Sequence, residues 1–166
     1  MSTTMRVSHD LAGDVETVYA LVTNPEFLER KFTDAGAQGV SVTSEPKADG
    51  GVRLVINRRV TVDLPGFAAK FVQPTNTFVQ TEDWAPASAD GRRVCTYQVE
   101  VQGVPSRING TVTLTPVDGQ TRQDIVAEVK VSIPLVGGRL EKFAVDSGKS
   151  VLDGEAAFTN AELTAR

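Results

Sequence analysis

The sequence predicts an α+β domain in which one curved antiparallel β-sheet is covered by a long C-terminal helix. Three observations support this prediction. Alternation of apolar and polar residues, interrupted by turn-forming stretches, continues from residue 40 to residue 133. One strand-like segment and two short helical patterns precede it. The stretch VKVSIPLVGGRLEKF, residues 129–143, then passes from alternation to helical spacing through a proline and two glycines. The expected order is β-α-α-β-β-β-β-β-β-α.

The first part of the chain is expected to form one strand and two helices. TTMRVSHDL, residues 3–11, alternates apolar and polar side chains as a strand does. After Gly13 the period changes, and four apolar residues fall on one face of a short helix: Val15, Val18, Tyr19 and Val22. Asn24 and Pro25 end that helix and start another, because Asn is a good N-cap and Pro fits the first helical turn. The second helix carries Phe27, Leu28 and Phe32.

Six further strands are expected to form an antiparallel meander. Their approximate bounds are residues 40–45, 52–62, 77–84, 93–102, 106–115 and 123–133. The stretches between them are rich in turn-forming residues: 46–51, 86–91, 103–105 and 116–119. LPGFAAKF, residues 64–71, interrupts the series, and its proline, phenylalanines and small alanines predict a helical turn.

The alternation assigns each late strand one covered face and one solvent face. Cys95, Tyr97, Val99 and Val101 share a face, as do Ile125, Ala127, Val129, Val131 and Ile133. The 77–84 strand is ambiguous: the face with Phe78, Gln80, Glu82 and Trp84 is expected to be wet, with Val79 and Thr81 inward, although the reverse stays open. One of the neighbours Arg58 and Arg59 is expected to point to the covered side. Such an arginine could hold a ligand carboxylate, although a rim position in solvent is favoured.

The last helix begins after Gly138, where apolar residues return at helical spacing. Pro134 ends the hydrogen bonding of the preceding strand, and the glycine pair Gly137 and Gly138 is expected to let the backbone turn sharply and pass close to the sheet. The long helix therefore folds back over the strands that precede it.

Composition limits the class of protein. The chain has 166 residues, 17 basic and 21 acidic, giving a formal net charge of -4. This length predicts a single domain, residues 1–166. No basic run stands out, so nucleic-acid binding is not expected. The N-terminal residues show no signal-peptide pattern, and no apolar stretch is long enough for a membrane span, so the protein is expected to be soluble and cytoplasmic.

Residues suited to catalysis or metal binding are few. His9 is the only histidine and Cys95 the only cysteine, so neither a typical zinc site nor a disulfide is expected, and no metal, cofactor or catalytic residue is assigned. Cys95 is expected to be a small buried hydrophobe. Glu82 is the best candidate for acid–base chemistry, should its strand face be covered, because Phe78 and Trp84 share that face. Glu155 on the last helix is expected to be solvated or in a surface pair.

Two stretches of the sequence resemble a known superfamily. VSHDLAGDVETVYALVTNPEFL near the N-terminus is similar to the strand-helix opening of the START-like (SRPBCC) superfamily, and VKVSIPLVGGRLEKF is similar to its passage from the last strand to the closing helix. This is the group of polyketide cyclases/dehydrases and lipid-transport proteins, and the chain looks most like an uncharacterised bacterial branch. The order of elements matches over nearly the whole chain. The resemblance implies a helix-grip fold with a ligand cavity, but no particular reaction.

A curved sheet that wraps one long helix commonly leaves an apolar cavity between them, and the function is expected to lie there. Binding or carriage of a hydrophobic small molecule or lipid is the favoured function. The expected ligand-binding residues are Phe67, Phe71, Phe78, Trp84, Tyr97, Val99, Val129, Val131, Phe143, Ala144, Ser147 and Val151.

Two alternatives stay open. An enzyme of cyclase, dehydratase or aromatase type, which the resemblance also implies, would need polar residues such as Glu82, Tyr97 or Arg59 inside the cavity. A protein-interaction module would act through its surface and expose a large apolar patch. A protein partner and the identity of the ligand cannot be inferred from the sequence.

Overall fold

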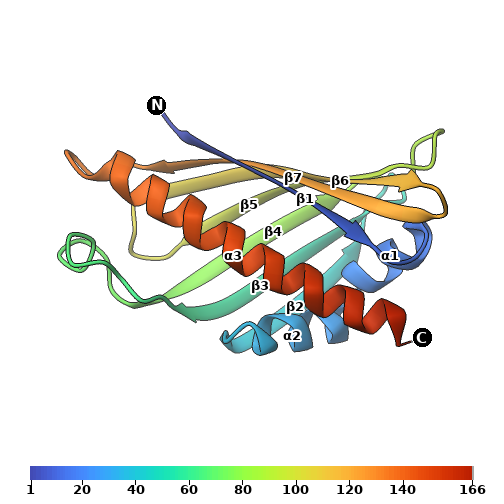
Figure 1. Cartoon of the computed structure of the whole chain (residues 1–166), viewed down its shortest axis with the longest axis horizontal. Coiled ribbons are helices and arrows are strands. Elements are labelled where there is room, and N and C mark those ends of the chain that lie inside the picture. Colours follow the sequence, from blue (N-terminus) through green and yellow to red (C-terminus); the bar gives the residue numbers. More distant parts are fainter. Residues whose placement is uncertain (166) are drawn as a thin grey trace.

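The computed structural model describes residues 1–165, so Arg166, the last residue of the expected domain, lies outside the described part. Three helices and seven strands follow the expected order (Figure 1). Their bounds are β1 Thr3–Leu11, α1 Val15–Val22, α2 Pro25–Asp34, β2 Gln38–Pro46, β3 Val52–Thr61, β4 Thr75–Trp84, β5 Arg93–Val101, β6 Ser106–Val117, β7 Gln120–Val131 and α3 Gly137–Thr164. The predicted α+β class and order of elements are confirmed.

All seven strands form one antiparallel sheet in the order β1-β7-β6-β5-β4-β3-β2. The first strand therefore pairs with the last, and β2 and β1 are the two edges. The β6–β7 turn is tighter than the predicted 116–119 stretch, because only Asp118 and Gly119 connect the strands. Both residues have positive φ, 52° and 78°, as a two-residue type I′ hairpin requires.

The short helices start where the sequence predicts. The Asp14 carboxylate accepts the Thr17 backbone N–H at the start of α1, and the Asn24 side chain accepts the Phe27 N–H at the start of α2. Both helices bury their apolar faces in one core cluster. The cluster also contains Leu54 of β3, Trp84 of β4 and Cys95 of β5. Residues 65–72 form the predicted helical turn, with the Ala69 N–H donating to the Pro65 carbonyl.

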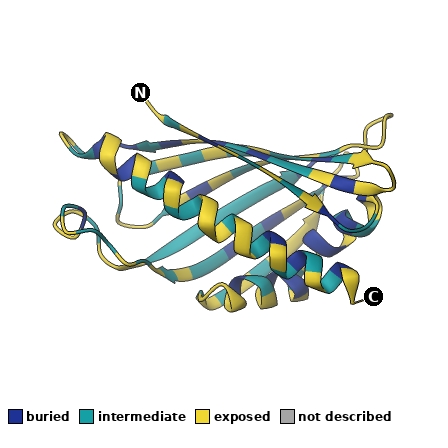
Figure 2. Cartoon of the chain, in the orientation of Figure 1, coloured by how far each residue is buried: buried dark blue, intermediate teal, exposed yellow. Residues whose placement is uncertain are grey.

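α3 crosses one face of the sheet diagonally, which we call the inner face (Figure 1). It packs mainly on β1 and β7, and near its C-terminal end it also contacts α2. One stripe of α3 is buried in these contacts, and Figure 2 shows the rest of the helix surface largely exposed or intermediate. The buried stripe includes Glu141, Val145, Ala156, Thr159 and Leu163.

The passage into α3 uses one close contact and one unusual backbone conformation. A Cβ on Gly137 would lie 2.4 Å from the Val131 carbonyl oxygen, whereas a Cβ on Gly138 would meet nothing within 4 Å. The sharp turn occurs at Leu135, whose φ is 72°. The expectation that both glycines are needed was therefore wrong for Gly138, because helix geometry directs its missing side chain away from the sheet.

Buried Glu141 fixes the first turn of α3 to the sheet. Its carboxylate accepts the backbone N–H of Val131 and the hydroxyl of Thr3, each at 2.9 Å. The last N–H of β7 thereby gains a partner that no neighbouring strand provides. Among residues 1–165, no helix is both long and apolar enough to cross a membrane.

Candidate functional site: a cleft between α3 and the sheet

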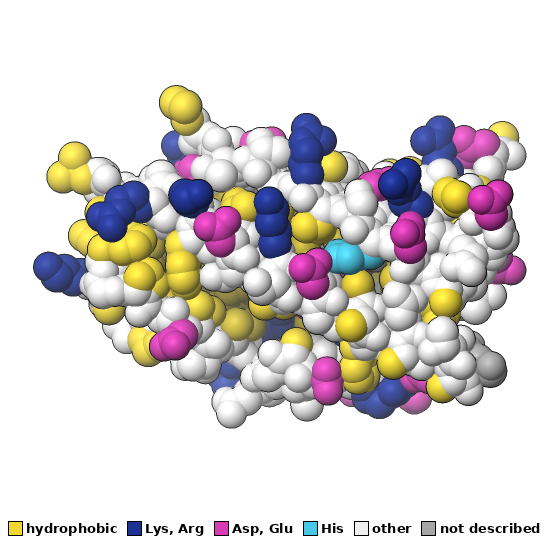
Figure 3. All heavy atoms as spheres, in the orientation of Figure 1, with side chains coloured by type: hydrophobic (Ala, Val, Ile, Leu, Met, Phe, Trp, Pro, Cys, Tyr) yellow, Lys and Arg dark blue, Asp and Glu magenta, His cyan; other side chains and the backbone are white. Residues whose placement is uncertain are grey.

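α3 leaves part of the inner face uncovered. Its main strand contacts are with β1 and β7, at one side of the sheet. Beneath it, inner-face residues of β7 such as Ile125, Ala127 and Val129 are buried. On β4, by contrast, Phe78, Gln80 and Glu82 of the same face are only partly buried (Figure 2). Figure 3 shows hydrophobic side chains set back beneath α3, with a basic side chain among them. This uncovered region, centred on β4 and bordered by Arg58 of β3 and Tyr97 of β5, is the cleft.

A second stripe of α3 borders the cleft. Ala144, Ser147 and Val151 follow one another at helical spacing and lie about a quarter turn from the buried stripe. Ala144 and Ser147 are partly buried, and Val151 is 48% exposed. The stripe therefore carries an apolar side chain, Val151, that remains largely exposed.

Both ends of the cleft are closed by packing. At one end, Phe158 of α3 meets Phe27 of α2 with ring centroids 5.8 Å apart. At the other end, Leu140 of α3 and Val131 of β7 bury Ala68 of the 65–72 turn. The uncovered inner face is therefore a bounded cleft whose middle is open.

A chain of polar side chains runs along the cleft floor on β3 and β4. Arg58 donates from Nη2 to Gln80 Oε1 at 3.1 Å. Gln80 donates from Nε2 to Glu82 Oε2 at 2.6 Å, and Trp84 donates from Nε1 to the other Glu82 oxygen at 2.9 Å. The network is fixed by the strand register, which places Arg58 opposite Phe78 and Ile56 opposite Gln80.

Arg58 lies in an unusual environment for a cation. Its guanidinium carbon stands 4.5 Å from the centroid of the Phe32 ring and 5.5 Å from that of Phe78. The residue keeps some exposed surface, but its Nη1 atom is enclosed and has no hydrogen-bond partner among the described residues. Burial lowers the pKa of Arg58, an effect that Glu155 and Glu82 partly offset.

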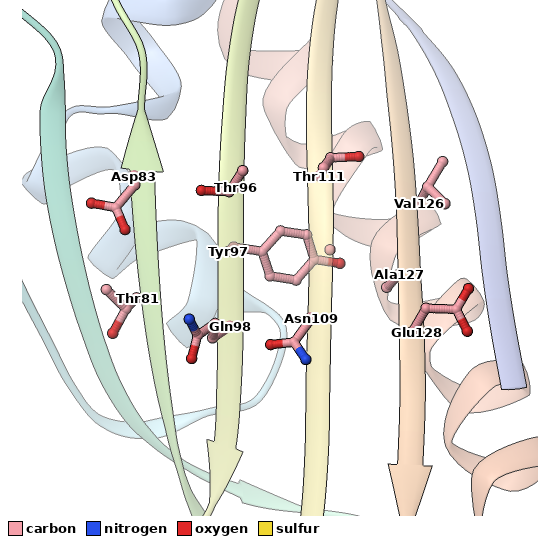
Figure 4. A pocket seen from close by; sticks show the side chains of 11 residues that line it. Thr81, Asp83, Thr96, Tyr97, Gln98, Asn109, Thr111, Val126, Ala127 and Glu128 are labelled. Atoms are coloured by element: carbon pink, nitrogen blue, oxygen red, sulfur yellow. The ribbon is translucent and has the colours of Figure 1, made fainter. Parts of the chain in front are cut away.

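Two further groups complete the polar part of the cleft. The Tyr97 ring extends from β5 over β6, where Gly110 leaves room for it (Figure 4). Burial, with smaller contributions from nearby Glu82, Cys95 and Glu155, raises the pKa of Tyr97 to about 12. Glu155 of α3 lies 3.7 Å from the Lys31 ammonium of α2, and both side chains are 13% exposed.

The expected ligand-binding residues divide into three groups. Phe78, Tyr97, Ala144, Ser147 and Val151 lie around the cleft, with Phe143 beside the same helix stripe. Trp84, Val99, Val129 and Val131 are buried in the core beside or beneath it. Phe67 and Phe71 belong to the 65–72 turn; Phe67 lies under the Arg139 guanidinium at 3.9 Å, and Phe71 is 47% exposed.

Three expectations about polar residues are corrected. The face of β4 with Gln80 and Glu82 is the inner one, because the register sets these residues opposite buried Ile56 and Leu54. Arg58 lies on the inner face beneath Phe32 instead of at a solvated rim, while Arg59 is exposed. Glu155, expected in solvent or in a surface pair, is paired with Lys31, but both side chains are only 13% exposed, so the pair is not a surface one. The alternation of β4 alone could not reveal its covered face, but that of its partner β3 could have.

The remaining groups of interest lie away from the cleft. His9 on β1 contacts Asp153 of α3 through Nε2 at 2.8 Å, on the covered side where α3 meets β1. Cys95 is fully buried, and burial raises the pKa of its thiol. Within residues 1–165 no group of three or more His, Cys, Asp or Glu residues is arranged to hold a metal ion.

Two surface hollows lie outside the cleft. A groove of about 390 Å³ on the outer face of β4 to β7 is lined mainly by short polar side chains, among them Thr81, Thr96 and Asn109 (Figure 4). A hollow of about 600 Å³ lies between the N-terminal residues and the start of α3. Both are wide open to solvent, so neither encloses an apolar molecule.

The sequence matches other proteins along nearly its whole length. The profile of a family described as "Protein of unknown function (DUF2505)" matches residues 6–163. An uncharacterized protein of Mycobacterium tuberculosis is 22% identical over 166 residues, covering 95% of each chain.

Solved structures share the fold. The Zhui aromatase/cyclase from Streptomyces sp. R1128 superposes with a TM-score of 0.63 at 14% identity, covering 100% of this chain and 97% of the other. A conserved protein from Geobacillus kaustophilus gives a TM-score of 0.61 at 14% identity over 98% and 96% of the two chains. A protein from Thermus thermophilus gives 0.60 at 18% identity over 96% and 99%. These likenesses confirm the helix-grip fold.

Proposed function

The chain belongs to the DUF2505 family of unknown function, and from the geometry of its cleft we propose that it binds a hydrophobic small molecule or lipid between α3 and the inner face of β3, β4 and β5. The observation that carries the proposal is the contrast within one sheet face. Under α3 the inner face is buried, whereas Phe78 and its neighbours on β4 stay partly exposed between two closed ends.

In a completely filled core, no partly exposed apolar side chains would remain between two packed ends. Apolar surface that stays in contact with water does not stabilise the fold, but burying it under a bound ligand is favourable. A bounded apolar cleft is therefore a common form of small-molecule site. Val151 on the roof and Phe78 on the floor would gain burial from an apolar ligand. The fold also fits membership of the START-like (SRPBCC) superfamily, in which a ligand occupies the space between sheet and closing helix. Carriage of the bound molecule, chemically unchanged, is the simplest function for this arrangement.

The first test identifies the ligand and its place. Native mass spectrometry of freshly purified protein should show a copurifying apolar molecule. The neutral fluorescent probe N-phenyl-1-naphthylamine should bind, and Ala144→Trp should weaken its binding because the indole would occupy the cleft. Ala157→Trp is the matched control, since Ala157 is exposed on the solvent face of the same helix. Undiminished probe binding by a folded Ala144→Trp variant would place the site elsewhere.

The second candidate is an enzyme of cyclase, dehydratase or aromatase type. It is favoured by the polar groups Glu82, Tyr97 and Arg58 on the cleft floor. Against it, both Glu82 oxygens already accept hydrogen bonds, and a Tyr97 pKa of about 12 makes its hydroxyl a poor proton donor near neutral pH. The copurified molecule should be incubated with the protein and analysed after release. Conversion that disappears in Glu82→Gln would favour the enzyme over the carrier.

A further inference from the structure

We propose that the ligand of this cleft carries a carboxylate, which pairs with the Arg58 guanidinium on β3. The inference rests on the proposed binding function and specifies its ligand class: an amphipathic monoanion, with an apolar body under α3 and an anionic head group at Arg58. The structural basis is a partly buried cation that, among the described residues, has no carboxylate in contact and no partner for its enclosed Nη1 atom. No carboxylate of residues 1–165 lies within 4 Å of it, and its one hydrogen bond goes to the neutral amide of Gln80.

The hydrogen-bonding capacity of Arg58 is mostly unused. A guanidinium has five N–H groups, and here Nη2 donates to Gln80 while enclosed Nη1 has no acceptor. Burying a charge without a partner costs free energy, so such groups in native proteins are normally paired. One neutral hydrogen bond and two aromatic contacts leave the guanidinium able to turn toward a head group that enters beside Gln80. A carboxylate would then supply both the missing charge and the missing acceptors.

The surroundings favour a flat head group with a single charge. Phe32 and Phe78 stand against the guanidinium at 4.5 and 5.5 Å, so a small planar carboxylate fits beside the two rings more readily than a tetrahedral phosphate. Glu82 and Glu155 are close enough to affect the pKa of Arg58, so a doubly charged phosphate monoester would meet more repulsion than a carboxylate. Gln80 separates Arg58 from Glu82 and prevents a direct ion pair that would neutralise the cation.

The test measures displacement of N-phenyl-1-naphthylamine by decanoate, 1-decanol and decyl phosphate, each below its micelle-forming concentration. Decanoate should displace the probe from the wild-type protein at about tenfold lower concentration than decanol, as expected for a charge-assisted pair. Arg58→Gln should bring the two concentrations close together. Arg59→Gln, which removes the exposed neighbouring cation, should leave the difference unchanged.

A second variant covers the possibility that Arg58→Gln disturbs folding. Glu82→Gln keeps an acceptor for Trp84 but removes a negative charge near Arg58, so decanoate should bind several-fold more tightly while decanol is unaffected. Equal displacement by decanoate and decanol in the wild type overturns the carboxylate inference and leaves the binding proposal intact. Stronger displacement by decyl phosphate overturns the choice of head group. Absence of probe binding to the wild type overturns the binding proposal itself.

Discussion

The two glycines at the start of α3 should respond oppositely to the same substitution. A methyl group on Gly137 would lie 2.4 Å from the carbonyl oxygen of Val131, the last residue of β7, which pairs with Ser106 of β6. Moving these segments apart would also disturb the hydrogen bond from the Gly137 N–H to the Ile133 carbonyl at 2.9 Å. Overpacking typically costs about 1–3 kcal/mol, and helix propensity returns at most about 1 kcal/mol. We expect Gly137→Ala to lower the free energy of unfolding by about 2 kcal/mol.

Gly138→Ala is the matched control, because its Cβ would meet nothing within 4 Å. Here only helix propensity acts, and the free energy of unfolding should rise by up to about 1 kcal/mol. Urea denaturation followed by circular dichroism, with the slope of each transition compared to show that both variants unfold in the same way, measures the difference. A Gly137→Ala variant as stable as the wild type would refute the close approach as the reason for glycine at this position.

Three other substitutions test the same region and the cleft. Leu135→Gly should raise the free energy of unfolding by about 0.5–1 kcal/mol, because Leu135 has a φ of 72° and a fully exposed side chain; Leu135→Ala, which keeps a Cβ, should not. Glu141→Ala should lower it by about 2 kcal/mol, since the Val131 N–H loses its acceptor, whereas Glu141→Gln should cost less. Arg58→Met should leave it unchanged or raise it by about 1 kcal/mol, because replacing a buried charge by an apolar side chain of similar length is commonly neutral or favourable. Denaturant unfolding measures all three, and a marked loss in Arg58→Met would contradict the last.

The fold could be predicted because most strands carry their own alternation and each short helix its own apolar spacing. Asn24 caps α2 as the sequence predicts, and β3 and β5 to β7 begin or end within a few residues of their expected bounds. Antiparallel neighbours that are consecutive in the chain need only short turns, so local signals are enough to fix most of the sheet.

The cleft could be predicted only in outline. β4 carries polar residues on both faces, so its orientation depends on the register with β3, where Leu54 and Ile56 are buried. The partners of Arg58 likewise come from α2 and β4, which no spacing in the sequence relates to β3. The need for Gly137 is also a property of tertiary packing, because it depends on how close α3 comes to Val131. A sequence pattern describes the structure of one segment, whereas each of these features depends on how two or three segments pack together.

The polar floor of the cleft is difficult to explain by stability alone. A chain selected only for folding would gain from an apolar side chain at position 58, because Arg58 is partly buried and, within the described part of the chain, has no carboxylate in contact and leaves its enclosed Nη1 without a partner. Glu141 is a useful contrast: it too is a buried charged residue, but both its oxygens accept hydrogen bonds that anchor α3 to the sheet. A buried charge that is fully satisfied supports the fold, whereas one left unsatisfied beside a cleft costs stability until something binds. If Arg58→Met folds as well as the wild type yet loses its preference for carboxylates, recognition of a ligand is the reason for that cost.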